Sequence, residues 1–154
     1  MSRHLRPVDE HRRISEPGDG RTRVVLANDH LGLRRSLRWL LDHEQDLDVV
    51  DEASDFEAAL HKVATHHPDV LVLDLRMPDG FSAERIDQLR TASPSTGIVV
   101  TTMHANDTFA AQALRAGAVG FVVADSADRE LTDAVRQAAR GLVYTSPRLA
   151  RAVA

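Results

Sequence analysis

Two aspartates and a threonine stand at the ends of short apolar runs in this chain. Asp29 follows the run 24–28, Asp74 follows 70–73, and Thr102 closes a run that begins at Ile98. Each run is uninterrupted and rich in β-branched residues, which is typical of a parallel strand buried on both faces. In an open α/β sheet the carboxyl ends of neighbouring strands converge on one crevice. We therefore expect two carboxylates and a hydroxyl to form a site for Mg²⁺ and a phosphoryl group.

Five short motifs, each weak alone, occur in a fixed order along the chain. They are Asn-Asp-His at 28–30, Leu-Asp-Leu-Arg-Met-Pro at 73–78, Thr-Met-His at 102–104, Ala-Gly-Ala-Val-Gly-Phe at 116–121 and Gly-Leu-Val-Tyr at 141–144. In this order and spacing they resemble the receiver domain of bacterial two-component response regulators of the NarL/FixJ (LuxR-type) class. The resemblance covers residue 21 to about residue 146, most of the chain.

The resemblance implies a phosphoacceptor and a magnesium site. Asp74 is the expected phosphoacceptor, because a carboxylate can attack phosphorus and form an acyl phosphate. The phosphoryl group would come from a sensor histidine kinase. The attack brings an anion against a phosphodianion, so a divalent cation has to bridge them. By resemblance the Mg²⁺ ligands are Asp29, Asp74 and the backbone carbonyl of Arg76, with Asn28 acting through water. An aspartate at a strand end can instead simply cap a turn or helix, but three such positions in family order favour the site.

The resemblance also assigns residues that sense the phosphate. Thr102 is expected to donate its hydroxyl to the phosphoryl oxygens, and His104 borders the phosphate. Phe121 occupies the position of an aromatic ring that changes rotamer with the threonine, and plain core packing is the alternative for it. His30 is expected to pack against or cap the first helix. Three histidines near the end of the second helix suit a solvated helix end better than a metal site: His61, His66 and His67.

Two positions depart from the family pattern. Asn28 replaces the first of two acids, which removes one negative charge and should weaken Mg²⁺ binding without abolishing it. Ala124 stands where the family has a lysine after strand five, so a weak conformational response to phosphorylation is expected. The single lysine, Lys62, is expected on the second helix, directed toward the opposite end of the sheet, where it cannot replace the missing charge. Arg76 or another arginine is the candidate to replace it.

Strand and helix patterns alternate five times, as in βαβ units with a parallel sheet. We expect strands at 23–28, 48–52, 69–74, 97–102 and 119–123. The second helix should begin with a capping box from Ser54 to Glu57. The predicted fold is an α/β, doubly wound, five-stranded parallel sheet of the flavodoxin-like receiver type, and the resemblance adds the strand order 2-1-3-4-5.

Composition limits the class of protein. The 154 residues are 43% hydrophobic, carry a net charge of −4 and include no cysteine, which suits one domain with one core and excludes thiolate chemistry. Because no apolar run approaches about 18 residues and no signal peptide is present, we expect a cytoplasmic protein without membrane contact. Residues 1–20 are predicted to be a disordered leader, 21–146 the receiver domain and 147–154 the start of a linker helix.

The predicted function is that of a response regulator rather than an enzyme, with at most Mg²⁺-dependent self-phosphorylation and slow autodephosphorylation. It would control transcription through a helix-turn-helix DNA-binding domain absent from this sequence, and could form homodimers through the helix 4–strand 5–helix 5 or helix 1–helix 5 surfaces. The alternative is a phosphorylation-independent pseudo-receiver that acts as an interaction module. A haloacid-dehalogenase-type phosphatase is disfavoured because Arg76 stands where that family needs a second acid. No glycine-rich loop follows the first strand, which excludes Rossmann and P-loop nucleotide sites.

Overall fold

A parallel β-sheet forms the centre of the molecule. The computed structural model describes residues 20–78, 82–103 and 108–145. The sheet has the order β2-β1-β3-β4-β5-β6, and all of its pairs are parallel. Its strands are β1 (Thr22–Ala27), β2 (Leu47–Ala53), β3 (Val70–Asp74), β4 (Gly97–Thr102), β5 (Gly120–Val123) and β6 (Tyr144–Thr145). The predicted order 2-1-3-4-5 is confirmed.

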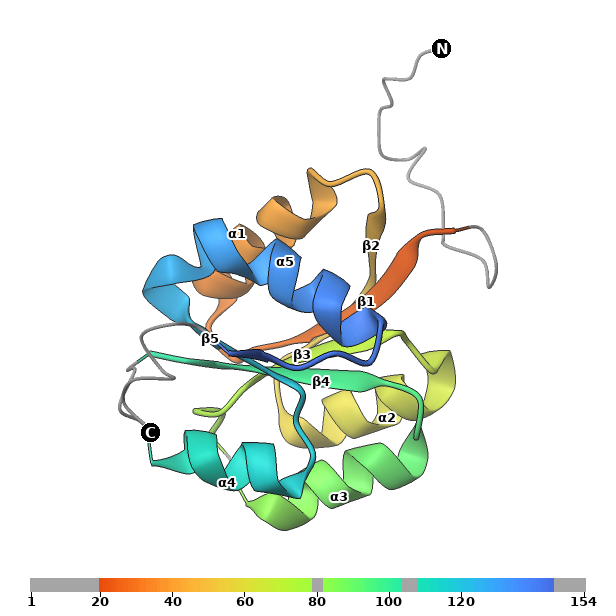
Figure 1. Cartoon of the computed structure of the whole chain (residues 1–154), viewed down its shortest axis with the longest axis vertical. Helices are drawn as coiled ribbons and strands as arrows, with labels where there is room; N and C mark the ends of the chain where they lie inside the picture. Colours follow the sequence, from red (N-terminus) through yellow and green to blue (C-terminus); the bar gives the residue numbers. More distant parts are fainter. Residues whose placement is uncertain (1–19, 79–81, 104–107, 146–154) are drawn as a thin grey trace.

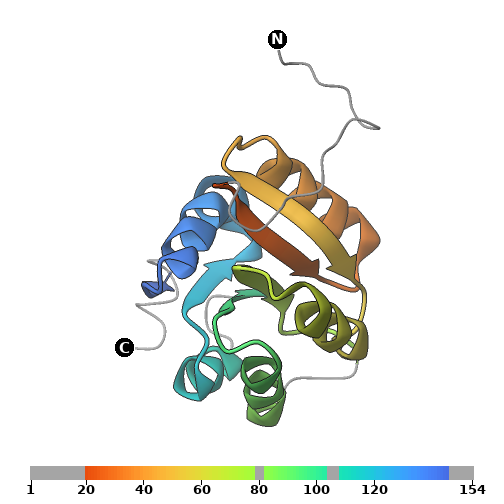
Figure 2. The same ribbon diagram turned by 90° about the vertical axis from the view of Figure 1, so that its right-hand side faces the viewer.

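Helices cover both faces of the sheet, as Figures 1 and 2 show. On one face lie α1 (Leu31–Asp42) and α5 (Ala127–Ala139), and on the other lie α2 (Phe56–His66), α3 (Ala83–Ala92) and α4 (Phe109–Ala116). A 3-10 turn at Ala124–Ser126 joins β5 to α5. This doubly wound arrangement follows from βαβ units, because a strand that is apolar on both faces has to be covered twice.

The central strands are buried as their sequences predict. Val24, Val25 and Leu26 of β1 have no exposed surface. Leu71 of β3 and Val100 of β4 have none either. Alternate residues of each strand therefore contribute to two separate hydrophobic clusters, one under α1 and α5 and the other under α2, α3 and α4. The clusters fix the sheet between two helical layers and hold its carboxyl edge in place.

All five predicted strands are present, and the sheet has one further short strand that the sequence did not predict. A sixth strand of two residues, β6, pairs with β5 through Tyr144 opposite Gly120, and the Tyr144 amide donates to the Val119 carbonyl at 2.8 Å. The turn before it contains Gly141 at φ +75, in the left-handed region that favours glycine. A strand of two residues is too short to show an alternating pattern in the sequence. It forms because the chain returns to the side of β5 after α5.

The start of α2 also differs from the predicted capping box by one residue. Asp55, not Ser54, is the N-cap, since its backbone is extended and its Oδ1 accepts a hydrogen bond from the Ala58 amide at 2.8 Å. Ser54 and Asp55 are both good N-cap residues, so the sequence could not separate them. The predicted leader and linker helix lie outside the described residues, apart from Gly20 at the leader's end.

Candidate functional site

The strand register brings the predicted site residues to one edge of the sheet. Ala27 of β1 lies opposite Leu73 of β3, so Asn28 and Asp29 leave β1 directly beside Asp74. On the other side of β3, Asp74 lies opposite Thr101, one residue before Thr102. Residues far apart in the sequence are thereby placed on three adjacent strand ends.

Asp74 ends β3 in a turn that its own side chain stabilises. Its Oδ1 accepts a hydrogen bond from the Arg76 amide at 3.1 Å, an Asx-type contact that bends the backbone. The Leu75 amide donates to the Thr101 carbonyl at 3.1 Å, which extends the contact with β4 past the last strand residue. Asp74 is half-buried and Asp29 is exposed, so both carboxylates lie at a boundary with solvent.

Asn28 is buried, with 1% of its surface exposed. Its backbone amide donates to the Ala53 carbonyl at 3.0 Å, and its Oδ1 accepts from the His30 amide at 2.8 Å. The side-chain Nδ2 is buried and has no hydrogen-bond partner among the described residues. Oδ1 still has a second lone pair, so the side chain can offer both a donor and an acceptor at this edge.

His30 begins α1. Its Nδ1 accepts a hydrogen bond from the Leu33 amide at 3.0 Å, so the imidazole fills the N-cap role usually taken by serine, threonine, asparagine or aspartate. The prediction that His30 caps the first helix is confirmed. The cap fixes the direction in which the chain leaves Asn28 and Asp29.

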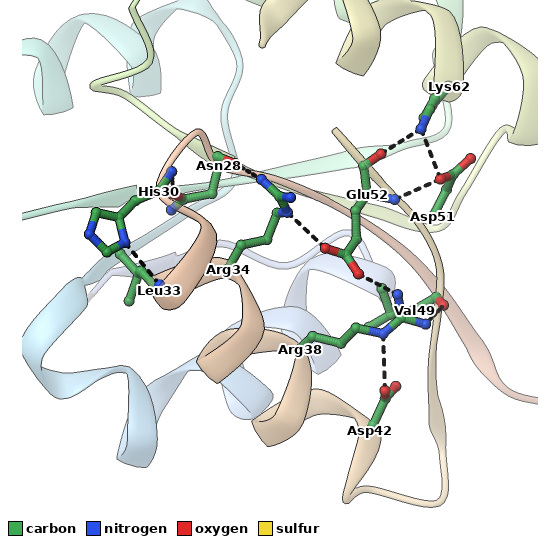
Figure 3. A network of polar contacts seen from close by, with 10 residues as sticks. All are labelled: Asn28, His30, Leu33, Arg34, Arg38, Asp42, Val49, Asp51, Glu52 and Lys62. Atoms are coloured by element: carbon green, nitrogen blue, oxygen red, sulfur yellow. Dashed lines mark hydrogen bonds and ion pairs between the residues drawn. The ribbon is translucent and has the colours of Figure 1, made fainter. Parts of the chain in front are cut away.

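A chain of charged hydrogen bonds connects the loop after β1 with β2, the strand at one side of the sheet (Figure 3). Arg34 donates from Nη1 to the Asn28 carbonyl at 2.6 Å and from Nε to Glu52 at 2.7 Å. Arg38 also bonds Glu52, and its Nε donates to Asp42 at 3.2 Å. Burial alone would raise the pKa of the Glu52 carboxyl, but the bonds from Arg38 and Arg34 outweigh it and hold that pKa below its usual value.

The comparisons with known proteins agree on one family. Residues 24–136 match the family model described as the response regulator receiver domain. The chain belongs to this family. It is 35% identical over 128 residues to the oxygen regulatory protein NreC of Staphylococcus carnosus, a match that covers 82% of the chain and 59% of NreC. The chain therefore spans about three fifths of the length of this curated relative.

Solved receiver structures have the same fold. A LuxR-family two-component response regulator from Aurantimonas sp. SI85-9A1 aligns with a TM-score of 0.80 at 31% identity, covering 86% of this chain and 95% of that one. The signal receiver domain of NarL from Mycobacterium tuberculosis aligns with a TM-score of 0.73 at 35% identity, covering 79% and 98%. These matches confirm the predicted NarL/LuxR-type receiver, a signalling family rather than an enzyme family.

In this receiver domain Thr102 and Phe121 are both buried. Thr102 has 1% of its surface exposed and lies opposite Val123 of β5. Phe121 lies opposite Val100, has no exposed surface and belongs to the cluster under α2, α3 and α4. Its ring is therefore a core side chain in this conformation. His104 lies outside the described residues.

Ala124 occupies the family's lysine position. It lies directly beside the site, but its side chain has no charge. Ala124 follows Val123, the residue opposite Thr102, and is half-buried at the start of the 3-10 turn. Lys62 lies over β2, where its Nζ donates to Asp51 at 3.0 Å and to the Glu52 carbonyl at 2.7 Å. Because Glu52 is the last residue but one of β2, the prediction that Lys62 is directed toward the opposite end of the sheet is wrong. Because β1 separates β2 from β3, Lys62 is held two strands away from Asp74.

Two of the three histidines near the end of α2 have identified partners. His66 Nε2 lies 2.9 Å from Asp51 Oδ2, and His67 Nδ1 lies 3.1 Å from Ser93 Oγ. Within the described ranges no group of three or more histidine, aspartate or glutamate side chains is arranged to hold a metal. None of the described helices has the length and apolar character needed to cross a membrane.

Sequence reasoning missed one charged residue at the site, Arg85 in the first turn of α3. A cavity of about 10 Å³ lies beside the end of β3, and Asp74 and Arg85 are both in its wall. The guanidinium carbon of Arg85 lies 4.5 Å from the centroid of the Phe56 ring. For an arginine on a short polar helix the sequence predicts a solvent-exposed side chain, so no local pattern indicates that Arg85 lies near Asp74.

Proposed function

We propose that Asp74 accepts a phosphoryl group from a sensor histidine kinase. A carboxylate oxygen of Asp74 bonds to phosphorus while the bond from phosphorus to the kinase's histidine nitrogen breaks, and that nitrogen keeps the electron pair. The observation that supports this role is the strand register, which places Asp29, Asp74 and Thr102 on three adjacent strand ends. Asp74 is half-buried, so the residue is in contact with solvent.

The oxygen groups at this edge fit Mg²⁺. A hard divalent cation prefers carboxylate, carbonyl and water oxygens, and Asp29 and Asp74 supply two carboxylates on neighbouring strand ends. We propose that they hold the ion together with the Arg76 backbone carbonyl, and that Asn28 acts through water. When bound, Mg²⁺ neutralises negative charge on the phosphoryl oxygens. Asn28 removes one carboxylate from the set, so the affinity for Mg²⁺ should be modest.

Thr102 is proposed to donate its hydroxyl to the phosphoryl group. It ends β4 next to the Asp74–Thr101 pair, at the same edge as the carboxylates. Phe121 lies on the next strand, opposite Val100, in the core under α2, α3 and α4. Movement of Thr102 toward a phosphoryl group would open space for the Phe121 ring to follow, and this is our proposal for the switch. His104 is proposed to border the phosphate.

The output is proposed to be control of transcription. NreC is named an oxygen regulatory protein and extends well beyond the region that this chain matches. We propose that phosphorylation changes a protein surface and acts on DNA through a helix-turn-helix domain outside this sequence. Homodimers through the α4–β5–α5 or α1–α5 surfaces would couple the receiver to paired DNA sites. Sedimentation with and without phosphodonor tests the dimer.

Intact-mass measurement tests the central proposal. The chain is incubated with Mg²⁺ and a small phosphodonor, and a gain of one phosphoryl group is expected. Asp74→Asn should remove the gain, and removal of Mg²⁺ by a chelator should prevent it. Asp87→Asn is the matched control, because Asp87 is an exposed aspartate on α3. A wild-type chain that never gains mass would instead support the phosphorylation-independent pseudo-receiver, for which Asn28 and Ala124 are the arguments.

A further inference from the structure

Phosphorylated Asp74 needs a positive charge that the family's lysine position does not supply. A phosphoryl group carries about two negative charges near neutral pH, and the carboxylate loses its own charge on forming the acyl phosphate, so the site becomes more negative by about one charge. Ala124 has no charge to offer, and Lys62 is bound to Asp51 and Glu52 over β2. A side chain that assists Mg²⁺ in neutralising this charge therefore has to come from another element of the fold.

Arg85 lies where such a group is needed. It shares with Asp74 the wall of the 10 Å³ cavity beside β3, and the other described residues of that wall are apolar: Phe56, Leu73, Leu75, Met77 and Ile86. Among the described residues that line this cavity, Asp74 is the one anion and Arg85 the one cation. A cavity of this size accommodates about one water-sized group, the size of a single oxygen atom with its hydrogens. Apolar walls also strengthen the attraction between opposite charges.

The Arg85 guanidinium is held in place by an aromatic ring. It lies 4.5 Å from the centroid of Phe56, a distance at which a cation is attracted to the ring face. Phe56 is the first residue of α2, and only 3% of its surface is exposed. A shift of Arg85 toward Asp74 would therefore change its contact with the first turn of α2. Arg76 is closer in sequence, but it is exposed and lies outside the wall of the cavity.

We propose that Arg85 supplies the positive charge for phosphorylated Asp74, and that its contact with Phe56 carries the response to the start of α2 and α3. This inference rests on the proposed phosphorylation of Asp74. If it is correct, part of the conformational response to phosphorylation occurs on the α2–α3 side of the domain, in addition to the α4–β5–α5 surface. Figure 2 shows α2 and α3 on the same face of the sheet.

The test uses the whole chain with Mg²⁺ and beryllium trifluoride, a phosphoryl mimic, followed by amide spectra. We expect the wild-type amides of the first turns of α2 and α3 to shift on binding. Arg85→Gln should weaken binding of the mimic about ten-fold or more, because a charge-assisted hydrogen bond is lost, and should remove those shifts. Arg85→Lys should retain most of the affinity. Arg90→Gln makes the same charge change on the same helix, outside the cavity, and should bind like the wild type.

Two further variants keep the test decisive. Phe56→Leu retains an apolar side chain but loses the ring, so the mimic should still bind while the shifts in α2 shrink. Adding Ala124→Lys to Arg85→Gln should restore binding if Arg85 has taken the lysine's role. Binding and shifts in Arg85→Gln equal to those of a responsive wild type overturn this inference alone. A wild type that neither gains mass nor binds the mimic overturns the proposed function, and this inference with it.

Discussion

Arg34 donates a hydrogen bond to the backbone carbonyl of Asn28 at 2.6 Å while its Nε bonds Glu52 at 2.7 Å. One side chain of α1 thus connects the loop that carries Asp29 with the edge strand β2 (Figure 3). The Arg34 side chain is 15% exposed and that of Glu52 is 24% exposed, so the pair is largely shielded from water. The position of the loop at the site therefore depends on a charged contact with β2, which is separated from β3 by β1.

Replacing Arg34 should destabilise the domain. Arg34→Gln removes two charge-assisted bonds and leaves the Asn28 carbonyl without this donor, at a cost of about 1–2 kcal/mol. Urea unfolding of the two proteins measures the difference. Arg35→Gln makes the same change on the exposed neighbouring residue and should be nearly neutral. Equal destabilisation by the two variants would contradict a specific role for Arg34.

The lowered pKa of Glu52 predicts a loss of stability in acid. Bonds from Arg38 and Arg34, partly opposed by burial, hold the folded-state pKa below the ordinary value of 4.5. The contribution of Glu52 is therefore complete above pH 4.5 and is lost as the pH falls through the lowered pKa. In Glu52→Gln the free energy of unfolding should be about 1 kcal/mol lower at pH 7. It should also fall less steeply below pH 4.5 than in the wild type, and parallel curves would disprove the assignment.

The cap of α2 offers a direct comparison of neighbouring residues. Asp55 accepts a hydrogen bond from the Ala58 amide at 2.8 Å, so Asp55→Ala should cost about 0.5–2 kcal/mol. Ser54→Ala should change the free energy of unfolding by less than about 0.5 kcal/mol, because Ser54 is exposed and is not the cap. Thermal unfolding of the two variants separates the cap in the structure from the capping box that the sequence suggests.

These residues show which features of the fold a sequence can predict. The strands that carry Asp29, Asp74 and Thr102 were predictable because each is an uninterrupted apolar run, and their parallel order followed from the alternation with helices. The α2 cap was predicted one residue early because Ser54 and Asp55 are equally suitable. Strand β6 was missed because two residues hold no periodic signal.

Arg85 was missed for a different reason. Its contact with Phe56 and its place in the wall of the Asp74 cavity join three elements, and no local pattern contains all of them. The absence of a lysine at Ala124 was visible in the sequence, and Arg76 or another arginine was the candidate to replace it. Only the packing of the folded chain brings Arg85 into the wall of the cavity beside Asp74, and for that reason Arg85 is the arginine that we propose.

Installing the family's lysine should enlarge the response. Ala124 follows the residue opposite Thr102, so a lysine there begins at the same edge of the sheet as Asp74. In Ala124→Lys one added charge-assisted hydrogen bond, about 1.5–3 kcal/mol, should favour the phosphorylated conformation roughly 10- to 100-fold. The wild-type chain should gain a phosphoryl group on Asp74 with only small amide shifts in β4 and β5, and the variant should show larger shifts there. Ala139→Lys, at an exposed position at the end of α5, controls for the added charge. If β4 and β5 respond equally with and without Lys at position 124, the weak response predicted from the missing lysine is wrong.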